Sequence, residues 1–324
     1  MLKPSLSHQE LLEKLTTRGL TLTETCDEQR ALRYLKLDGY YRLSGYFWGF
    51  YDKNSAVQPL HSFETDTTWD EILHLYHADK DLRTLLTKAL AEIELSIKAI
   101  LVDLVCEKIK KNTGKDHPCW CWEKQHFTTK FINSGKWDIL IQKLEKPISH
   151  ADPASYLKNY KNDYPQRKPY VWMMVQVLSF GEITTIANNL IPEYQRPFSQ
   201  QFNLNTHEMP AVLVSLSKLR NLCAHHNRIW NEKIREAPKI HKFDRLYNIN
   251  RMLDTKHHAQ SLAVMYFIVY HMLAQLHPSK SVEFQQDFGE WLHQLCDTEK
   301  RAKRFLPKMG FSPSILTEYF PAKP

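Results

Sequence analysis

The sequence contains little glycine, few cysteines and no long apolar run. Only 9 of its 324 residues are glycine, fewer than average usage would provide. Sparse glycine combined with periodic leucine-rich stretches favours helices over sheets. Six cysteines are too few to form a disulfide scaffold in a chain of this length. These shortages predict an all-α fold without a disulfide framework.

The chain also lacks segments typical of membrane targeting. Its first fifteen residues contain no apolar signal-peptide core. The most apolar stretch, 261–276, is too short to span a bilayer and contains His271, so we expect a buried helix there. We therefore expect no membrane partner and a location in the cytoplasm, where thiols stay reduced.

The charge balance is moderately basic. Lysine and arginine number 43 against 36 aspartates and glutamates, which gives a net charge of +7. This excess is compatible with a polyanionic partner such as nucleic acid, but many soluble proteins are equally basic. Charge therefore allows an RNA partner without identifying one.

Apolar periodicity and helix-capping signals divide the chain into three expected parts. These are N-terminal helical elements at 1–67 packed on the core, a helical domain at 68–298 and a basic C-terminal segment at 299–324. Helices are predicted at 8–18, 27–39, 69–109 with an interruption near Asp79, 136–146, 152–160, 170–178, 181–190, 194–203, 242–254, 258–276 and 282–297. Residues 111–135 are predicted to form a long loop, and 40–51 a packing segment between helices.

A further helix is predicted to begin near Pro210 and to run to about Glu232, with Pro238 closing the region. At about 100° per residue, one of its faces collects the polar residues Arg220, Asn221, His225, Asn227, Arg228 and Asn231. The opposite face collects Leu216, Leu219, Leu222, Cys223, Ile229 and Trp230. His226 falls within the apolar face, so we expect it to be a buried, hydrogen-bonded core histidine.

The polar face is unusual because it uses asparagine and histidine. An ordinary solvated helix face uses lysine and glutamate, which have higher helix propensity. Arg220 and Arg228 can pair with phosphate oxygens, and His225 can move a proton near neutral pH. Since no acidic cluster lies nearby in the sequence to hold a divalent metal, we expect metal-independent RNA cleavage without a cofactor. His225 would act as acid or base, and Arg220 would stabilise charge on phosphorus.

Two levels of resemblance support this interpretation. The segment from Arg220 to His225 has the form R-x4-H and resembles the motif of HEPN ribonucleases. Four segments together look like the Abi-2 family of bacterial abortive-infection proteins, the AbiD/AbiF type. They are, in order, "DGYYRLSGYFWGFY", "YHADKDLRTLLTKALAEIELSIKAIL", "VWMMVQVLSFGEITTIANNL" and "LSKLRNLCAHHNRIWN". The resemblance spans about residues 30–235.

The resemblance implies a HEPN-like helical bundle with additional N-terminal and C-terminal helices, and phage defence through RNA cleavage. It implies an active site built from two motifs that face each other across a homodimer, with Arg220 and His225 as the catalytic pair and Asn221 as the adjacent polar residue. His226, Asn227 and Arg228 belong to the family stretch. The family's relation to RNA-guided ribonucleases leaves a structured noncoding RNA partner open.

A second constellation lies on the predicted helix at 69–109. Asp79, Arg83 and Glu94 fall along the edge of its apolar stripe. A carboxylate at a core edge needs a partner. Asp79 and Arg83 can pair at i,i+4, and Glu94 can reach Arg83 or Arg220. A structural ion pair and a supporting role in catalysis both remain open for these residues.

Two other segments contain residues that could bind a ligand. His117, Cys119, Cys121 and His126 could in principle hold zinc, but C-x-C is not the usual spacing, and the adjacent tryptophans favour a packed loop. No metal is therefore predicted. The basic stretch 300–308 would either contact phosphates or form a solvated helix face.

The alternative to an enzyme is a non-catalytic RNA-binding or antitoxin-like HEPN protein. In that case the arginines hold RNA, and His225 only packs or forms hydrogen bonds. A ribonuclease controlled by a bound structured RNA is a further alternative.

Overall fold

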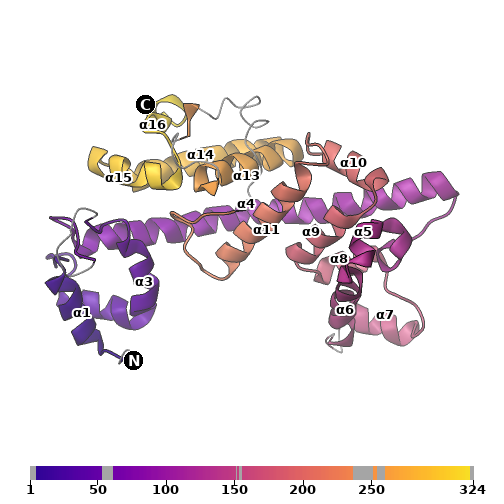
Figure 1. Cartoon of the computed structure of the whole chain (residues 1–324), viewed down its shortest axis with the longest axis horizontal. Helices are drawn as coiled ribbons and strands as arrows, with labels where there is room; N and C mark the ends of the chain where they lie inside the picture. The colour runs from indigo at the N-terminus through magenta and orange to yellow at the C-terminus, as the bar shows by residue number, and fades with distance from the viewer. Residues whose placement is uncertain are drawn as a thin grey trace.

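One long helix forms the backbone of the molecule. The computed structural model describes residues 5–52, 61–150, 152, 155–235, 251–253 and 260–321. In this part of the chain there are helices, turns and isolated β-bridges but no β-strand, so the all-α prediction is confirmed. Helix α4, Trp69–Thr113, has 45 residues and runs along most of the molecule (Figure 1).

The predicted interruption of α4 near Asp79 is wrong. The helix starts at the Thr68 side chain, which accepts from the Glu71 N–H, and ends at Gly114 in the left-handed conformation. Asp79 does not disturb it, because the Asp79 carboxylate bonds to groups outside the helix. An aspartate disfavours a helix interior mainly when its side chain competes for the local backbone.

The N-terminal elements pack at the beginning of α4 (Figure 1). They are α1 (His8–Thr17), α2 (Glu28–Tyr34), the π-helical turn η1 (Leu35–Gly39) and α3 (Tyr40–Phe47). The predicted packing segment at 40–51 therefore contains a helix. Gly39 has φ 83°, a left-handed conformation that glycine adopts at no steric cost, and there the chain enters α3 instead of stopping.

The middle of the chain forms short helices near the far end of α4 (Figure 1). They are η2 (Trp120–Trp122), η3 (Lys124–His126), α5 (Thr129–Asn133), α6 (Lys136–Ser149), α7 (Tyr156–Asp163), α8 (Val171–Val177), α9 (Phe180–Asn189) and α10 (Pro192–Gln200). The predicted loop at 111–135 thus contains two 3-10 turns and the whole of α5, while the helices predicted from 136 to 203 are present with shifted ends.

The C-terminal part packs back along α4. Its helices are α13 (Leu262–Leu276), α14 (Pro278–Leu295), α15 (Glu299–Met309) and α16 (Ile315–Glu318). The predicted buried helix is confirmed as α13, where the His271 Nε2 lies 2.8 Å from the Phe202 carbonyl oxygen. No helix in the described ranges is both long and apolar enough to cross a membrane. The helix predicted at 242–254 falls almost entirely outside the described residues.

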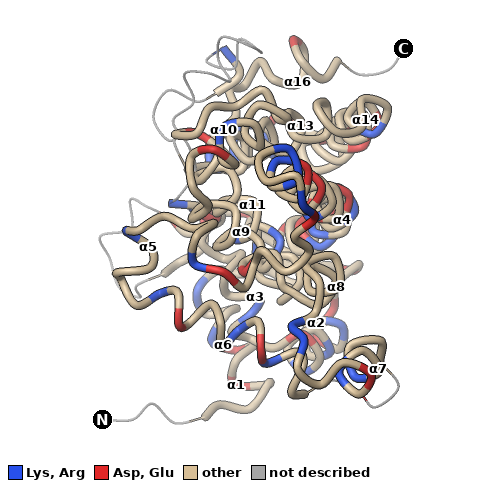
Figure 2. Tube along the Cα trace, turned by 90° about the vertical axis from the view of Figure 1, so that its right-hand side faces the viewer, with Lys and Arg blue, Asp and Glu red and all other residues tan. Residues whose placement is uncertain are grey.

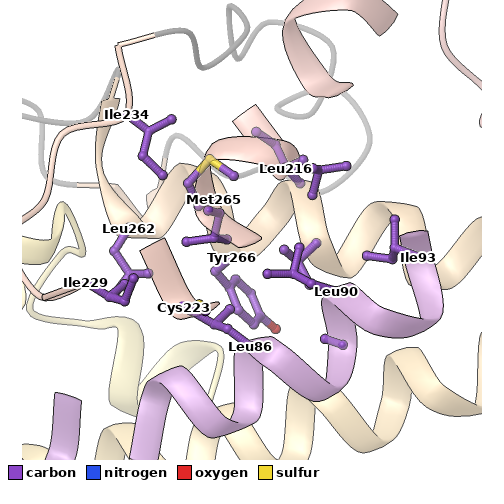
Figure 3. Packing of buried hydrophobic residues seen from close by; sticks show 14 of the residues in the cluster. Leu86, Leu90, Ile93, Leu216, Cys223, Ile229, Ile234, Leu262, Met265 and Tyr266 are labelled. Carbon is purple, nitrogen blue, oxygen red and sulfur yellow. The ribbon is translucent and has the colours of Figure 1, made fainter. Parts of the chain in front are cut away.

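The core lies where α4, α13 and α11 (Met209–Ala224) meet. Leu86 and Leu90 of α4 gather with Cys223 of α11 and with Met265 and Tyr266 of α13 (Figure 3). This packing fixes α11 against α4, so that any side chain at the edge of their interface has a defined position. The division of the chain near residue 68 remains a prediction.

Candidate functional site at the end of α11

Helix α11 ends at Ala224, eight residues before the predicted end at Glu232. The His226 N–H donates to the Cys223 carbonyl at 3.0 Å, and the Asn227 N–H donates to the Leu222 carbonyl at 2.9 Å. These two bonds and the positive φ of His226, 55°, form a Schellman motif. Glycine usually occupies that left-handed position, and no glycine marks it here, so the sequence carried no visible stop signal.

The early helix end divides the predicted polar face. Arg220 and Asn221 remain in the last turn of α11, and His225 is its C-cap residue. Asn221 and His225 are exposed, and the Arg220 side chain is 39% exposed. Asn227, Arg228 and Asn231 lie beyond the helix, so they do not share its face. The R-x4-H motif itself is therefore retained at one accessible helix end.

The prediction that His226 is a buried core histidine is wrong. His226 is exposed, and its backbone carbonyl accepts from the Arg42 Nη1 at 2.6 Å. The error follows from the helix end, because a helical-wheel position has no meaning once the chain leaves the helix. Arg42 of α3 was not predicted as a site residue, and its partner lies 184 positions away in the sequence.

Arg228 turns inward toward α3. Its Nη1 donates to the Gly45 carbonyl, and its Nη2 lies 3.7 Å from the Glu232 carboxylate. A Cβ at position 45 would meet the Arg228 side chain at 3.7 Å, which is ordinary contact. Of the two arginines predicted to pair with phosphate, only Arg220 therefore remains on the helix face.

Asp79 holds the segment that follows α11. Its side chain is buried, and its Oδ1 accepts from the Ile229 N–H at 3.0 Å and from the Trp230 N–H at 2.6 Å. Its Oδ2 accepts from the Tyr46 hydroxyl at 2.6 Å and from Arg83. Burial raises the pKa of the Asp79 carboxyl, and the four donors oppose that rise because each favours the ionised form.

The predicted i,i+4 pair of Asp79 and Arg83 is thus present. Arg83 also lies 3.4 Å from the Asn227 carbonyl oxygen. Together the two side chains connect α4 to the chain that follows the turn after α11, at Asn227, Ile229 and Trp230. Their role in the structure is to hold the segment after α11 against α4, so the turn at His226 leads into a fixed segment.

Glu94 positions Arg220. The Arg220 Nε donates to the Glu94 Oε2 at 3.1 Å, and the Lys98 Nζ lies 2.9 Å from the Glu94 Oε1. Glu94 and Lys98 are both 8% exposed. Of the two partners considered for Glu94, the structure shows Arg220. Lys98 was not predicted, although its i,i+4 spacing from Glu94 is a visible signal for an ion pair.

A pocket of about 460 Å³ adjoins the turn after α11. It is lined by Leu37, Asp38, Arg42, Tyr76, Lys80, Arg83, Thr84, Thr87, Cys223 and His226. Three of these side chains are lysine or arginine, and the one acidic member, Asp38, accepts from the Tyr76 hydroxyl at 2.5 Å. Since Arg83 already pairs with Asp79, Arg42 and Lys80 are the cations that this pocket could offer to an anion. His225 is not among its lining residues.

Basic residues elsewhere are engaged or dispersed. In α15, Arg301 pairs with Glu71 and Asp297, and Arg304 pairs with Glu64. The predicted basic stretch 300–308 thus holds α15 to other parts of the chain and is not simply a solvated face. Figure 2 shows basic and acidic residues interspersed along the chain, α4 included. Along the described residues, positive charge is therefore not collected in one segment.

The four residues considered for zinc do not converge as a set. The Cys119 Sγ lies 3.4 Å from the Lys168 carbonyl oxygen, and Cys121 is buried. Burial also raises the pKa of the Cys121 thiol, which opposes formation of the thiolate that binds metal. His117 and His126 instead approach Glu123, a residue that was not predicted.

Comparison with known proteins assigns the chain to a protein family. A family model described as Abi-like protein (Abi_2) matches residues 33–231, more than half of the chain. Neither the curated proteins nor the solved structures include a significant match. The four segments that resemble the Abi-2 family all lie within the matched range. The chain therefore belongs to the Abi-like protein family, as its sequence segments predicted.

Proposed function

We propose that this protein is an endoribonuclease of the HEPN type that acts in abortive-infection phage defence. Membership in the Abi-like family fits that defence role. The observation that carries the nuclease proposal is the placement of Arg220, Asn221 and His225 together at the accessible end of α11. The buried carboxylate of Glu94 accepts a hydrogen bond from the Nε of Arg220.

In the proposed reaction the ribose 2′-OH attacks the adjacent phosphorus of RNA. The 2′-oxygen forms a bond to phosphorus while the bond to the 5′-oxygen breaks, which leaves a 2′,3′-cyclic phosphate and a 5′-OH. His225 transfers a proton as acid or base. Glu94 accepts from the Nε of Arg220, so the two Nη groups can pair with the charged phosphate oxygens. Asn221 orients the phosphate or the imidazole.

The reaction centre is proposed to form between two copies of the chain. Each chain contributes one R-x4-H motif, and a proton must be both removed and delivered during the reaction. Asn221, Ala224 and His225 are exposed in the single chain, so they can meet the same face of a second copy related by two-fold symmetry.

The pocket beside the turn is proposed to guide the RNA. Arg42 and Lys80 can bind backbone phosphates. His226 lines this pocket and directly follows the R-x4-H motif in the sequence. Asn227 and Asn231 would contribute only at the edge, since they lie beyond α11. We place the reaction in the cytoplasm, because cellular and phage RNA are there.

The alternative is a non-catalytic RNA-binding or antitoxin-like protein. One observation favours it: the Arg220 guanidinium already pairs with Glu94, and Glu94 pairs with Lys98, so Arg220 has a structural partner. A ribonuclease held in check by a bound structured RNA is a variant of the main proposal, in which the pocket binds that RNA.

The deciding experiment compares cleavage of labelled RNA in excess EDTA by the wild type, His225→Ala and Arg220→Ala. His207→Ala is the matched control, because His207 is also exposed and lies just before α11. We expect cleavage by the wild type and the control and a loss of at least about 100-fold in the other two. Equal cleavage by all four proteins would exclude the enzyme, and RNA binding without any cleavage would support the alternative.

A further inference from the structure

A cluster of two histidines and a glutamate lies beyond the C-terminal end of α4. The His117 Nε2 is 3.0 Å from the Glu123 Oε1, and the His126 Nε2 is 3.7 Å from the Glu123 Oε2. One atom from each of the three residues lies within 4.8 Å of the other two. Two imidazole rings and one carboxylate from three positions in a single loop thus lie close enough together to share one ion.

His126 is held so that its Nε2 faces the Glu123 carboxylate. The residue is buried, and its Nδ1 lies 3.1 Å from the Tyr194 hydroxyl of α10. Its carbonyl accepts from the Ile191 N–H at 3.1 Å. A histidine that binds a metal through one nitrogen characteristically bonds through the other to a polar group, which fixes its tautomer and orientation. Tyr194 meets that requirement.

The side-chain amide of Gln125 lies where a cation bound to this cluster would be expected. Its Nε2 donates to the Glu123 Oε2 at 2.7 Å and lies 3.4 Å from the His126 Nε2. The amide group of Gln125 therefore lies beside both the Glu123 carboxylate and the His126 ring nitrogen of the cluster. Gln125 is exposed, so its side chain can move aside when a cation takes that place.

We propose that His117, Glu123 and His126 bind one zinc ion, through the two Nε2 atoms and the carboxylate, with water as the fourth ligand. Two imidazoles and a carboxylate suit zinc, whereas magnesium and calcium prefer oxygen ligands alone. His117 and Glu123 are about one-third exposed, with side-chain values of 34% and 37%, so the ion can enter from solvent.

The site is distinct from the proposed nuclease centre. About 30 Å of α4 separates Glu94 from the end of the helix at Thr113, and the cluster follows that end. Bound zinc would cross-link the two ends of the loop between α4 and α5 and would tie it to α10 through Tyr194. Its expected effect is on stability, and the metal-independent cleavage proposed above does not use it.

The test uses the untagged full chain after dialysis against EDTA and then against metal-free buffer. Zinc chloride is titrated by calorimetry into the wild type, Glu123→Gln, His117→Ala and His150→Ala. The last variant is the matched control, because His150 is an exposed histidine at the end of α6. We expect one zinc per chain for the wild type and for His150→Ala, and at least a tenfold weaker affinity for Glu123→Gln and His117→Ala.

Two further readouts make the result specific. Zinc should raise the melting temperature of the wild type but not of Glu123→Gln, and Gln125→Ala should bind zinc at least as tightly as the wild type. Circular dichroism establishes that each variant is folded, and if His117→Ala unfolds, the conservative Glu123→Gln decides. Equal zinc binding by the wild type and Glu123→Gln, or no binding by the wild type, would overturn the proposal. The three residues would then only form ion pairs with one another. RNA cleavage is not measured, so this outcome is independent of the nuclease test.

Discussion

Arg220 on α11 and Glu94 on α4 are joined by a hydrogen-bonded ion pair of 3.1 Å across 126 positions of sequence. The carboxylate is nearly buried and Lys98 bonds to its other oxygen. The pair therefore connects the residue proposed to bind phosphate to the longest helix of the protein.

Replacing Glu94 tests whether this pair positions Arg220. Glu94→Gln should lower the free energy of unfolding by about 1–3 kcal/mol, because it leaves Lys98 buried beside a neutral partner. It should also lower the cleavage rate constant more than the affinity for RNA. The measurements are urea denaturation and single-turnover cleavage. Glu92→Gln is the control, since Glu92 on the same helix pairs with Lys280 near the surface. Equal effects of both substitutions would contradict a positioning role.

Asp79 is expected to be the most sensitive charged residue for stability. Asp79→Asn should cost about 3–5 kcal/mol, because it removes the charge that compensates buried Arg83 and places an amide N–H2 group among four donors. Urea denaturation followed by circular dichroism measures this loss. Asp81→Asn provides the comparison on the exposed side of the same helix, and we expect it to change stability by less than about 0.5 kcal/mol. Similar stabilities for the two variants would refute the buried network.

Because His226 has a left-handed conformation and Ala224 a helical one, a glycine substitution should affect stability differently at these two positions. His226→Gly should leave stability unchanged or raise it by up to about 1 kcal/mol, because a non-glycine residue is strained at this φ. Ala224→Gly, inside the helix, should lower stability by about 0.5–1 kcal/mol. Thermal and urea denaturation measure both. If His226→Gly destabilised as much as Ala224→Gly, the helix would have to continue through 226.

Lys80 is predicted to contact RNA through the pocket beside the turn. Lys80→Ala, made in the His225→Ala background to prevent cleavage, should weaken RNA binding several-fold. It should also reduce the magnitude of the slope of log K against log salt concentration by about 1, the value for one lost phosphate contact. Fluorescence anisotropy at several salt concentrations measures both quantities. The control is Lys88→Ala, because Lys88 lies on α4 but faces Glu283 and Asp287 of α14. A salt dependence that falls equally in both variants would place the RNA elsewhere.

The sequence by itself determined the helical class, the family and most of the individual helices. These follow from local patterns, since a helix signals itself through apolar periodicity and capping residues within a few turns. The same local geometry placed Arg220 and Asn221 on one face of α11, although it put His225 within the helix and not at its end, and it predicted the pair of Asp79 and Arg83 on α4. Each of these relationships spans at most five residues.

Only the tertiary structure decided where α11 ends and what its polar residues do next. His226 adopts a left-handed turn that glycine usually marks, and the turn is held by Asp79 and Arg42, which lie far away in the sequence. Contacts over such separations leave no periodic trace. They turned Arg228 toward Gly45 and left His226 exposed, because packing of distant helices overrides what local propensity favours.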